Sequence, residues 1–128
     1  MVSLITKGVK VSVETFYQAD VSQPANNEFR FIYRITIENN SSQTIKLLRR
    51  KWVIVDGYGK ENIVQGDGVI GKQPIIEPNG YHQYVSGCLL KTEIGKMSGT
   101  YAVEKLIDNS AIDIVIPEFK LVAPFKLN

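Results

Sequence analysis

The chain contains only one cysteine, Cys88, and one histidine, His82, among its 128 residues. A lone cysteine cannot form an internal disulfide, which suits a reducing compartment and predicts a cytoplasmic location. A tight zinc or cobalt site takes about four nitrogen or sulfur ligands, so these two residues exclude one. Both lie on one predicted strand, about 20 Å apart at the usual strand rise, and cannot form a catalytic pair within the chain. We therefore expect no catalytic residues and no enzyme, with His82 on a solvent face and Cys88 in the core.

Long apolar runs and a dominant charge are missing as well. No stretch approaches the ~18 apolar residues that span a bilayer, and the N-terminal residues lack the apolar block of a signal peptide. The net charge of +2 is too small to indicate a nucleic acid or an anionic membrane surface as a partner. We therefore predict no membrane span and no nucleic-acid partner.

Helical periodicity is scarce, and alternation of apolar and polar residues dominates instead. Residues 29–37 are apolar at every odd position, which is typical of a strand with one buried face. Residues 9–13 and 112–116 alternate similarly, and turn-forming residues separate these segments. We predict a single domain over residues 1–128, an all-β antiparallel sandwich of about seven or eight strands. The other predicted strands cover residues 44–56, 63–65, 81–90, 97–107 and 119–121, with hairpin loops at 39–42 and 108–110 and a surface loop at 18–27.

A full G-x-G-x-x-G pattern runs through Gly66, Gly68 and Gly71 and is followed by Lys72. A dinucleotide-binding turn of this kind needs a helix after its third glycine, because the helix N-terminus holds the pyrophosphate. Prolines at positions 74 and 78 exclude that helix. One remaining interpretation is a glycine-rich turn or bulge that lets two strands approach closely. The other is a loop whose backbone amides hold a phosphate, a pyrophosphate or a carboxylate, with Gly66, Asp67, Gly68, Gly71 and Lys72 as the ligand-binding residues.

A basic cluster, formed by Arg49, Arg50 and Lys51, precedes the only tryptophan, Trp52. One interpretation is a patch that docks a partner or contacts phosphate. The other is a solvated strand edge whose tryptophan packs in the core, as a lone tryptophan of a β-sandwich usually does. With a period of two, Arg50 shares the face of Trp52, so we expect its stem to pack inward and its guanidinium to pair with a carboxylate. Arg49 and Lys51 share the opposite face.

Five sequence blocks resemble the ApaG family in their order and spacing. They are residues 47–52 (LLRRKW), 65–74 (QGDGVIGKQP), 84–87 (YVSG), 95–101 (GKMSGTY) and 116–121 (IPEFKL). The resemblance covers nearly the whole chain, and Lys51 departs from it because relatives often carry His or Tyr there. It implies an immunoglobulin-like or fibronectin-III-like β-sandwich and a link to cobalt and magnesium efflux or resistance. It also implies a gene beside that of a diadenosine tetraphosphate hydrolase in many bacteria, and an interaction module in some eukaryotic proteins.

These observations favour a non-catalytic binding or regulatory module whose ligand is a protein partner or a phosphorylated small molecule. The alternative is a nucleotide- or pyrophosphate-binding protein, with a dinucleoside polyphosphate as one such ligand. In that case Asp67 would hold a weakly bound Mg²⁺ together with the phosphates, since Mg²⁺ needs only one or two carboxylates. We expect no other cofactor, and pairing of exposed sheet edges between copies of the chain stays open.

Overall fold

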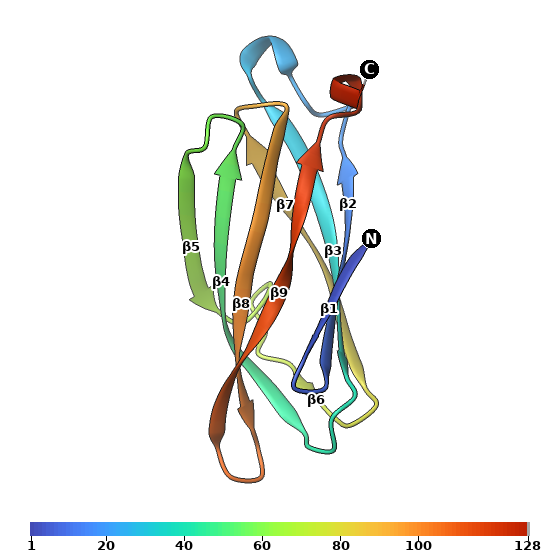
Figure 1. Cartoon of the computed structure of the whole chain (residues 1–128), viewed down its shortest axis with the longest axis vertical. Coiled ribbons are helices and arrows are strands. Elements are labelled where there is room, and N and C mark those ends of the chain that lie inside the picture. The colour runs from blue at the N-terminus through green and yellow to red at the C-terminus, as the bar shows by residue number, and fades with distance from the viewer. Residues whose placement is uncertain (128) are drawn as a thin grey trace.

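The computed structural model describes residues 1–127, so Asn128, the last residue of the predicted domain, lies outside it. Antiparallel strands form two sheets that face each other (Figure 1). The strands are β1 (Val2–Thr6), β2 (Val9–Tyr17), β3 (Phe29–Asn39), β4 (Ile45–Asp56), β5 (Glu61–Asp67), β6 (Ile75–Ile76), β7 (Tyr81–Leu90), β8 (Ile94–Lys105) and β9 (Ser110–Val122). The helical segments within residues 1–127 are two 3₁₀ turns, Pro24–Asn26 and Pro124–Leu127. No helix of this part of the chain has the length and apolar character needed to cross a membrane.

The two sheets have the orders β1-β2-β3-β7 and β5-β4-β8-β9, with β6 paired to β4. The prediction of an all-β antiparallel sandwich is therefore confirmed. The alternation predicted for residues 29–37 is also confirmed, because every odd side chain of β3 is buried. Strands β1 and β6 were not expected: β1 is almost wholly exposed and β6 has only two residues, so neither leaves a period-two pattern.

The core is centred on aromatic rings contributed by both sheets. Trp52 is buried, which confirms its predicted place in the core. Its ring centroid lies 5.4 Å from that of Tyr33, 5.8 Å from that of Phe119 and 6.5 Å from that of Tyr101. The Trp52 ring meets all three at steep angles, the edge-to-face arrangement that aromatic rings prefer.

The loop at residues 39–42 is not a hairpin, contrary to the prediction. It joins β3 to β4, which belong to different sheets, so it carries the chain across the sandwich. Asn39 organises this crossing from a fully buried position: its Nδ2 donates to the carbonyls of Gln43 (2.8 Å) and Ile76 (2.9 Å), and its Oδ1 accepts from Ser41. The loop at residues 108–110 does join two paired strands, β8 and β9, as predicted.

The short strand predicted at residues 119–121 is part of β9, which continues through Pro117. The pairing of β9 with β8 shifts register between Met97 and Gly99, opposite this proline. A proline is accommodated there because β9 lies at the edge of its sheet and the shift already interrupts the hydrogen-bond ladder.

Candidate functional site

The first two glycines of the G-x-G-x-x-G pattern each lie in close contact with another segment. Gly66 lies in β5, where an added Cβ would come within 2.8 Å of both terminal nitrogens of Arg50. Gly68 has a φ of +62°, and a Cβ there would collide with the backbone carbonyl of Lys72. These contacts agree with the interpretation of a glycine-rich turn that brings two strands close together.

Residues 69–72 form a tight two-residue turn. The Val69 amide donates to the Lys72 carbonyl (2.8 Å) and the Lys72 amide to the Val69 carbonyl (3.0 Å). Ile70 and Gly71 have φ values of +48° and +72°, which define a type I′ turn. The left-handed conformation is unfavourable for a β-branched residue. Ile70 adopts this conformation although it is 58% exposed. The sequence prediction that no helix follows the glycines is confirmed, since the chain continues into β6.

Three amides of this segment are already bonded within the chain. Those of Val69 and Lys72 close the turn, and the Gly68 amide donates to the Leu48 carbonyl at 2.8 Å. Lys72 and Asp67 are both exposed, and Asp67 lies opposite Arg49 in the pairing of β5 with β4. In residues 1–127, no three His, Cys, Asp or Glu side chains gather closely enough to hold a metal ion. The role of Gly66, Asp67, Gly68, Gly71 and Lys72 in binding a ligand therefore stays a prediction.

Arg50 lies on the inner face of β4, half-buried between the sheets. Its Nη1 donates to the backbone carbonyls of Asp67 (3.1 Å) and Gly68 (3.0 Å). The expected pairing with a carboxylate is wrong, because none of the carboxylates of residues 1–125 forms an ion pair with Arg50. Backbone carbonyls take the place of the carboxylate. Strand β5 ends at Asp67, and the carbonyls of Asp67 and Gly68 face the guanidinium at this point.

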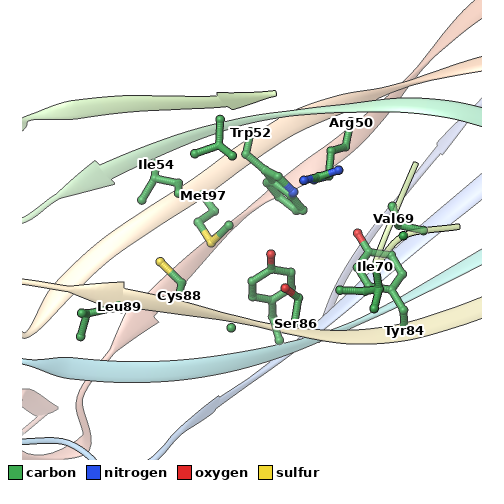
Figure 2. Close-up of a pocket in the computed structure, with 14 residues that line it drawn as sticks. Arg50, Trp52, Ile54, Val69, Ile70, Tyr84, Ser86, Cys88, Leu89 and Met97 are labelled. Atoms are coloured by element: carbon green, nitrogen blue, oxygen red, sulfur yellow. The ribbon is translucent and has the colours of Figure 1, made fainter. Parts of the chain in front are cut away.

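The predicted basic patch is divided between two faces of β4. Arg49 and Lys51 are exposed on the outer face, where they border a shallow hollow with Thr100 and Ala102. Arg50 points the opposite way, into the space between the sheets (Figure 2). This division agrees with the period-two alternation read from the sequence, and the role of the three residues as a docking patch stays a prediction.

Arg50 borders an open cavity of about 370 Å³ between β4 and β7. One end is polar, with Arg50, Tyr84 and Ser86, and the turn at residues 69–71 forms a wall there (Figure 2). The other end is apolar and is lined by Ile54, Cys88, Leu89 and Met97. A cavity divided in this way suits a ligand with an anionic group at one end and an apolar part at the other.

Tyrosine hydroxyls gather at the polar end. The hydroxyls of Tyr84 and the fully buried Tyr101 lie 2.5 Å apart. Burial raises the pKa of both, and the positive charge of Arg50 only partly opposes this. Burial also raises the pKa of Tyr33, against a lowering effect of its hydrogen bond with Ser86. All three hydroxyls are therefore neutral at pH 7 and do not neutralise Arg50.

His82 does not lie on the solvent face, contrary to the prediction. It is half-buried on the inward side of β7, with its ring centroid 6.2 Å from that of Tyr84. Burial lowers the pKa of His82, and the positive charge of Lys72 lowers it further. The charge of Lys72 in the glycine segment therefore acts on His82 of β7.

Cys88 packs against the core and lines the apolar end of the cavity. The sequence analysis placed it in the core, and the structure leaves it half-buried at the cavity wall. Burial raises the pKa of its thiol to about 11, which makes it a weak nucleophile at neutral pH.

Several cavity residues were given no binding role in the sequence analysis, chiefly Tyr33, Tyr84, Ser86 and Ile70. The alternation of β7, in which Tyr84, Ser86 and Cys88 share one face, was the available signal. That signal indicates a half-buried strand, but it does not show that a cavity remains between β7 and β4.

Comparisons with known proteins identify the family. A model of the ApaG domain matches residues 19–105. Protein ApaG of Paramagnetospirillum magneticum is 45% identical over 97% of this chain and 95% of its own length, and that of Brucella abortus is 44% identical over the same shares. Among solved structures, the ApaA protein from Bordetella pertussis is 35% identical with a TM-score of 0.88, covering 91% of this chain and 94% of its own. A structural genomics target is 39% identical with a TM-score of 0.85, covering 91% and 88%. This chain therefore belongs to the ApaG domain family.

Proposed function

We propose that this protein is a non-catalytic binding module that recognises an anionic group in the cavity beside Arg50. The observation that supports the proposal is a half-buried guanidinium that bonds backbone carbonyls and has no carboxylate partner within residues 1–127. A partly desolvated cation is unfavourable until an anion offsets its charge. A ligand carboxylate or phosphate would supply that anion and could also accept hydrogen bonds from the hydroxyls of Tyr84 and Ser86.

The apolar end of the cavity favours a protein partner as the source of the anion. A segment that carries an acidic side chain and a nearby apolar side chain would fill both ends of the cavity. In this proposal Gly68 and Gly71 shape the wall, Gly66 makes room for the guanidinium, and Lys72 adds positive charge at the rim.

The chemistry of the other polar residues favours binding over catalysis. Cys88, with its raised pKa, is a weak nucleophile, and His82 lies near the opposite end of β7. We therefore assign no catalytic role to either residue. We also expect the protein to act in the cytoplasm, where a free thiol is stable. The association with cobalt and magnesium resistance would then be an indirect effect of the partner that is bound.

A phosphorylated small molecule is the second candidate ligand. The positive charge of Lys72 near His82 and the exposed carboxylate of Asp67 favour it. A nucleotide, a pyrophosphate or a dinucleoside polyphosphate would place its phosphates between Arg50 and Lys72, with Mg²⁺ held weakly by Asp67.

Backbone NMR titrations test these ligands against one another. N-acetylglutamate, pyrophosphate and a diadenosine polyphosphate are each added to the protein, with and without Mg²⁺ or Co²⁺. We expect saturable shifts centred on Arg50, Gly66–Gly68 and Tyr84, and their loss in Arg50→Gln but not in the outer-face control Arg49→Gln. Shifts that are unchanged in Arg50→Gln, or no saturable shift with any of these anions, would contradict the proposal. Larger shifts with the polyphosphate than with N-acetylglutamate would favour the second candidate.

A further inference from the structure

Strand β7 is the last strand of its sheet in the described chain, so one of its edges has no β-partner. The orientation of its backbone follows from a bond just before the strand, where the Asn39 amide donates to the Gly80 carbonyl at 2.9 Å. Bonding alternates along an antiparallel pair, so the even residues of β7 bond to β3. The amides and carbonyls of Gln83, Val85, Gly87 and Leu89 therefore point away from the sheet, toward the open edge.

This edge lacks the features that normally prevent pairing with another chain. Its ten residues, Tyr81–Leu90, include no proline and no Asp, Glu, Lys or Arg. The edge strand β5 carries Glu61 and Asp67, and the edge strand β9 carries Pro117 and a register shift. β1 is short and lies against β9, where the Val115 amide donates to the Thr6 hydroxyl. Only β7 among these edges is long, uncharged and uninterrupted, which is typical of a template for strand addition.

Gly87 lies in the middle of this edge without a structural need for glycine. Its φ is not positive, and an added Cβ would meet only the Phe31 carbonyl oxygen, at an ordinary 3.4 Å. Glycine inside a strand weakens the strand, and one common reason for it is the close approach of another backbone. Gly87 is exposed and borders the cavity, so a strand that pairs with β7 would approach it there.

The cavity opens along this same edge. The inward side chains Tyr84, Ser86 and Cys88 line it together with Gly87 and Leu89. A strand added to β7 would turn every second side chain toward the cavity, because facing residues of paired strands share a face. Tyr84 and Cys88 are four residues apart, about 13 Å along a strand. One inward side chain would therefore reach the polar end at Arg50, and another, four positions away, would reach the apolar end at Met97.

We infer that β7 binds an extended peptide segment of a partner protein by strand addition, with an acidic side chain at Arg50 and an apolar side chain four residues away at Met97. This inference rests on the proposed function and adds the form of the ligand. Main-chain bonds to Gln83, Val85, Gly87 and Leu89 supply affinity, and the two ends of the cavity supply specificity, as in other cases of strand addition. The charge of Arg50 and the absence of charge on β7 select an acidic segment over a basic one.

Capped heptapeptides test the inference. TLTSTET places leucine, serine and glutamate opposite Cys88, Ser86 and Tyr84 in an antiparallel pairing, and TETSTLT does so in a parallel pairing. We expect one of them to bind at least tenfold more tightly than N-acetylglutamate, and at least fivefold more tightly than its glutamine version. We also expect slowed amide hydrogen exchange at Val85 and Gly87, whose amides face the open edge. The Tyr84 amide, bonded to β3, is the internal reference and should not change.

Two variants distinguish the contribution of the β7 edge to binding from that of the Arg50 charge. Val85→Pro removes an outward amide without touching the β3 ladder, and Val85→Thr is its matched control. We expect Val85→Pro to reduce peptide affinity at least tenfold while N-acetylglutamate still binds as in the wild type. Val85→Thr should bind the peptide normally. Arg50→Gln should abolish the binding of N-acetylglutamate, weaken the binding of the peptide and remove its preference for glutamate. The more conservative Arg50→Lys should retain part of that preference.

Each remaining outcome counts against the inference. If N-acetylglutamate binds at Arg50 but neither peptide binds more tightly, strand addition is wrong and the proposed anion site stands. If the peptides bind equally well to Val85→Pro, the open edge is not the contact. If the unliganded protein dimerises in sedimentation velocity and Val85→Pro makes it monomeric, the occupant is a second copy of this chain instead of a partner peptide.

Discussion

Arg34 and Arg50 are both partly buried arginines on central strands, and their surroundings differ completely. On the outer face of its sheet, Arg34 donates to Glu14 through Nε (3.1 Å) and Nη2 (2.9 Å) and lies 5.6 Å from the centre of the Phe16 ring. Arg50 lies between the sheets and bonds two carbonyls. The first arginine is neutralised within its own sheet and acts structurally. The second keeps an uncompensated charge at the edge of a cavity, so the same residue type is structural in one place and available to a ligand in the other.

The largest expected effect concerns two aromatic residues, Trp52 on the sheet face of Arg50 and Phe16 beside Arg34. Trp52→Ala should lower the free energy of unfolding by about 3–5 kcal/mol, because it removes a buried ring and leaves a cavity next to Arg50. Phe16→Ala should lower it by only about 1 kcal/mol, because Phe16 is 43% exposed and its main loss is the contact with Arg34. Urea unfolding of both variants measures the difference. Similar losses in the two would show that the inner site is no better packed than the outer one.

Removal of the two charges should separate stability from binding. Arg34→Gln should cost ~0.2–1 kcal/mol, as for other exposed ion pairs, and leave ligand binding unchanged. Arg50→Gln should cost about 1–2 kcal/mol, because the carbonyls of Asp67 and Gly68 lose a donor, and it should also abolish anion binding. Urea unfolding gives the first quantity and NMR titration with N-acetylglutamate gives the second. Anion binding that depends on Arg34 as much as on Arg50 would remove the distinction between them.

The strained turn beside Arg50 should yield a gain in stability. Asparagine tolerates the left-handed conformation that Ile70 adopts, so Ile70→Asn should raise the free energy of unfolding by about 1 kcal/mol. Ile75 is equally exposed at 58% but lies in β6, where asparagine is unfavourable. Ile75→Asn should therefore be neutral or destabilising, and thermal melts compare the two. A loss of stability in Ile70→Asn would mean that the isoleucine side chain makes contacts that outweigh its strain.

The smallest effect concerns Lys72, whose charge acts on His82. Burial and the charge of Lys72 lower the pKa of His82 below 6.5, so the native state favours the neutral ring. The stabilisation is complete above pH 6.5, and it is lost as the pH falls through the native pKa because the unfolded state binds the proton more readily. Lys72→Gln should raise the pKa of His82 in an NMR titration of its ring, whereas the outer-face control Lys51→Gln should not. An unchanged pKa in Lys72→Gln would place the lysine away from β7.

The sequence predicted the architecture well because the buried faces follow local alternation. The odd residues of β3 and the inward place of Trp52 both followed from a period of two. It failed where an outcome depended on contacts between distant segments. Residues 39–42 were taken for a hairpin because turn-forming residues look alike whether the next strand pairs in the same sheet or crosses to the other one. Residues 112–116 and 119–121 were taken for separate strands, because the continuation of a strand through Pro117 depends on β9 lying at an edge.

The alternation of side chains along each strand sufficed to assign the sandwich, the buried tryptophan and the opposite directions of Arg49 and Arg50, since these depend on backbone geometry within one strand. The packing of the two sheets and the order of strands within each decided three other features. These are the partner of Arg50, the cavity and the open edge of β7. Arg50 meets the carbonyls of Asp67 and Gly68 because β5 turns away beside β4, a meeting of segments that no local pattern encodes. The charge of one arginine was in the sequence; its availability to a ligand was a consequence of folding.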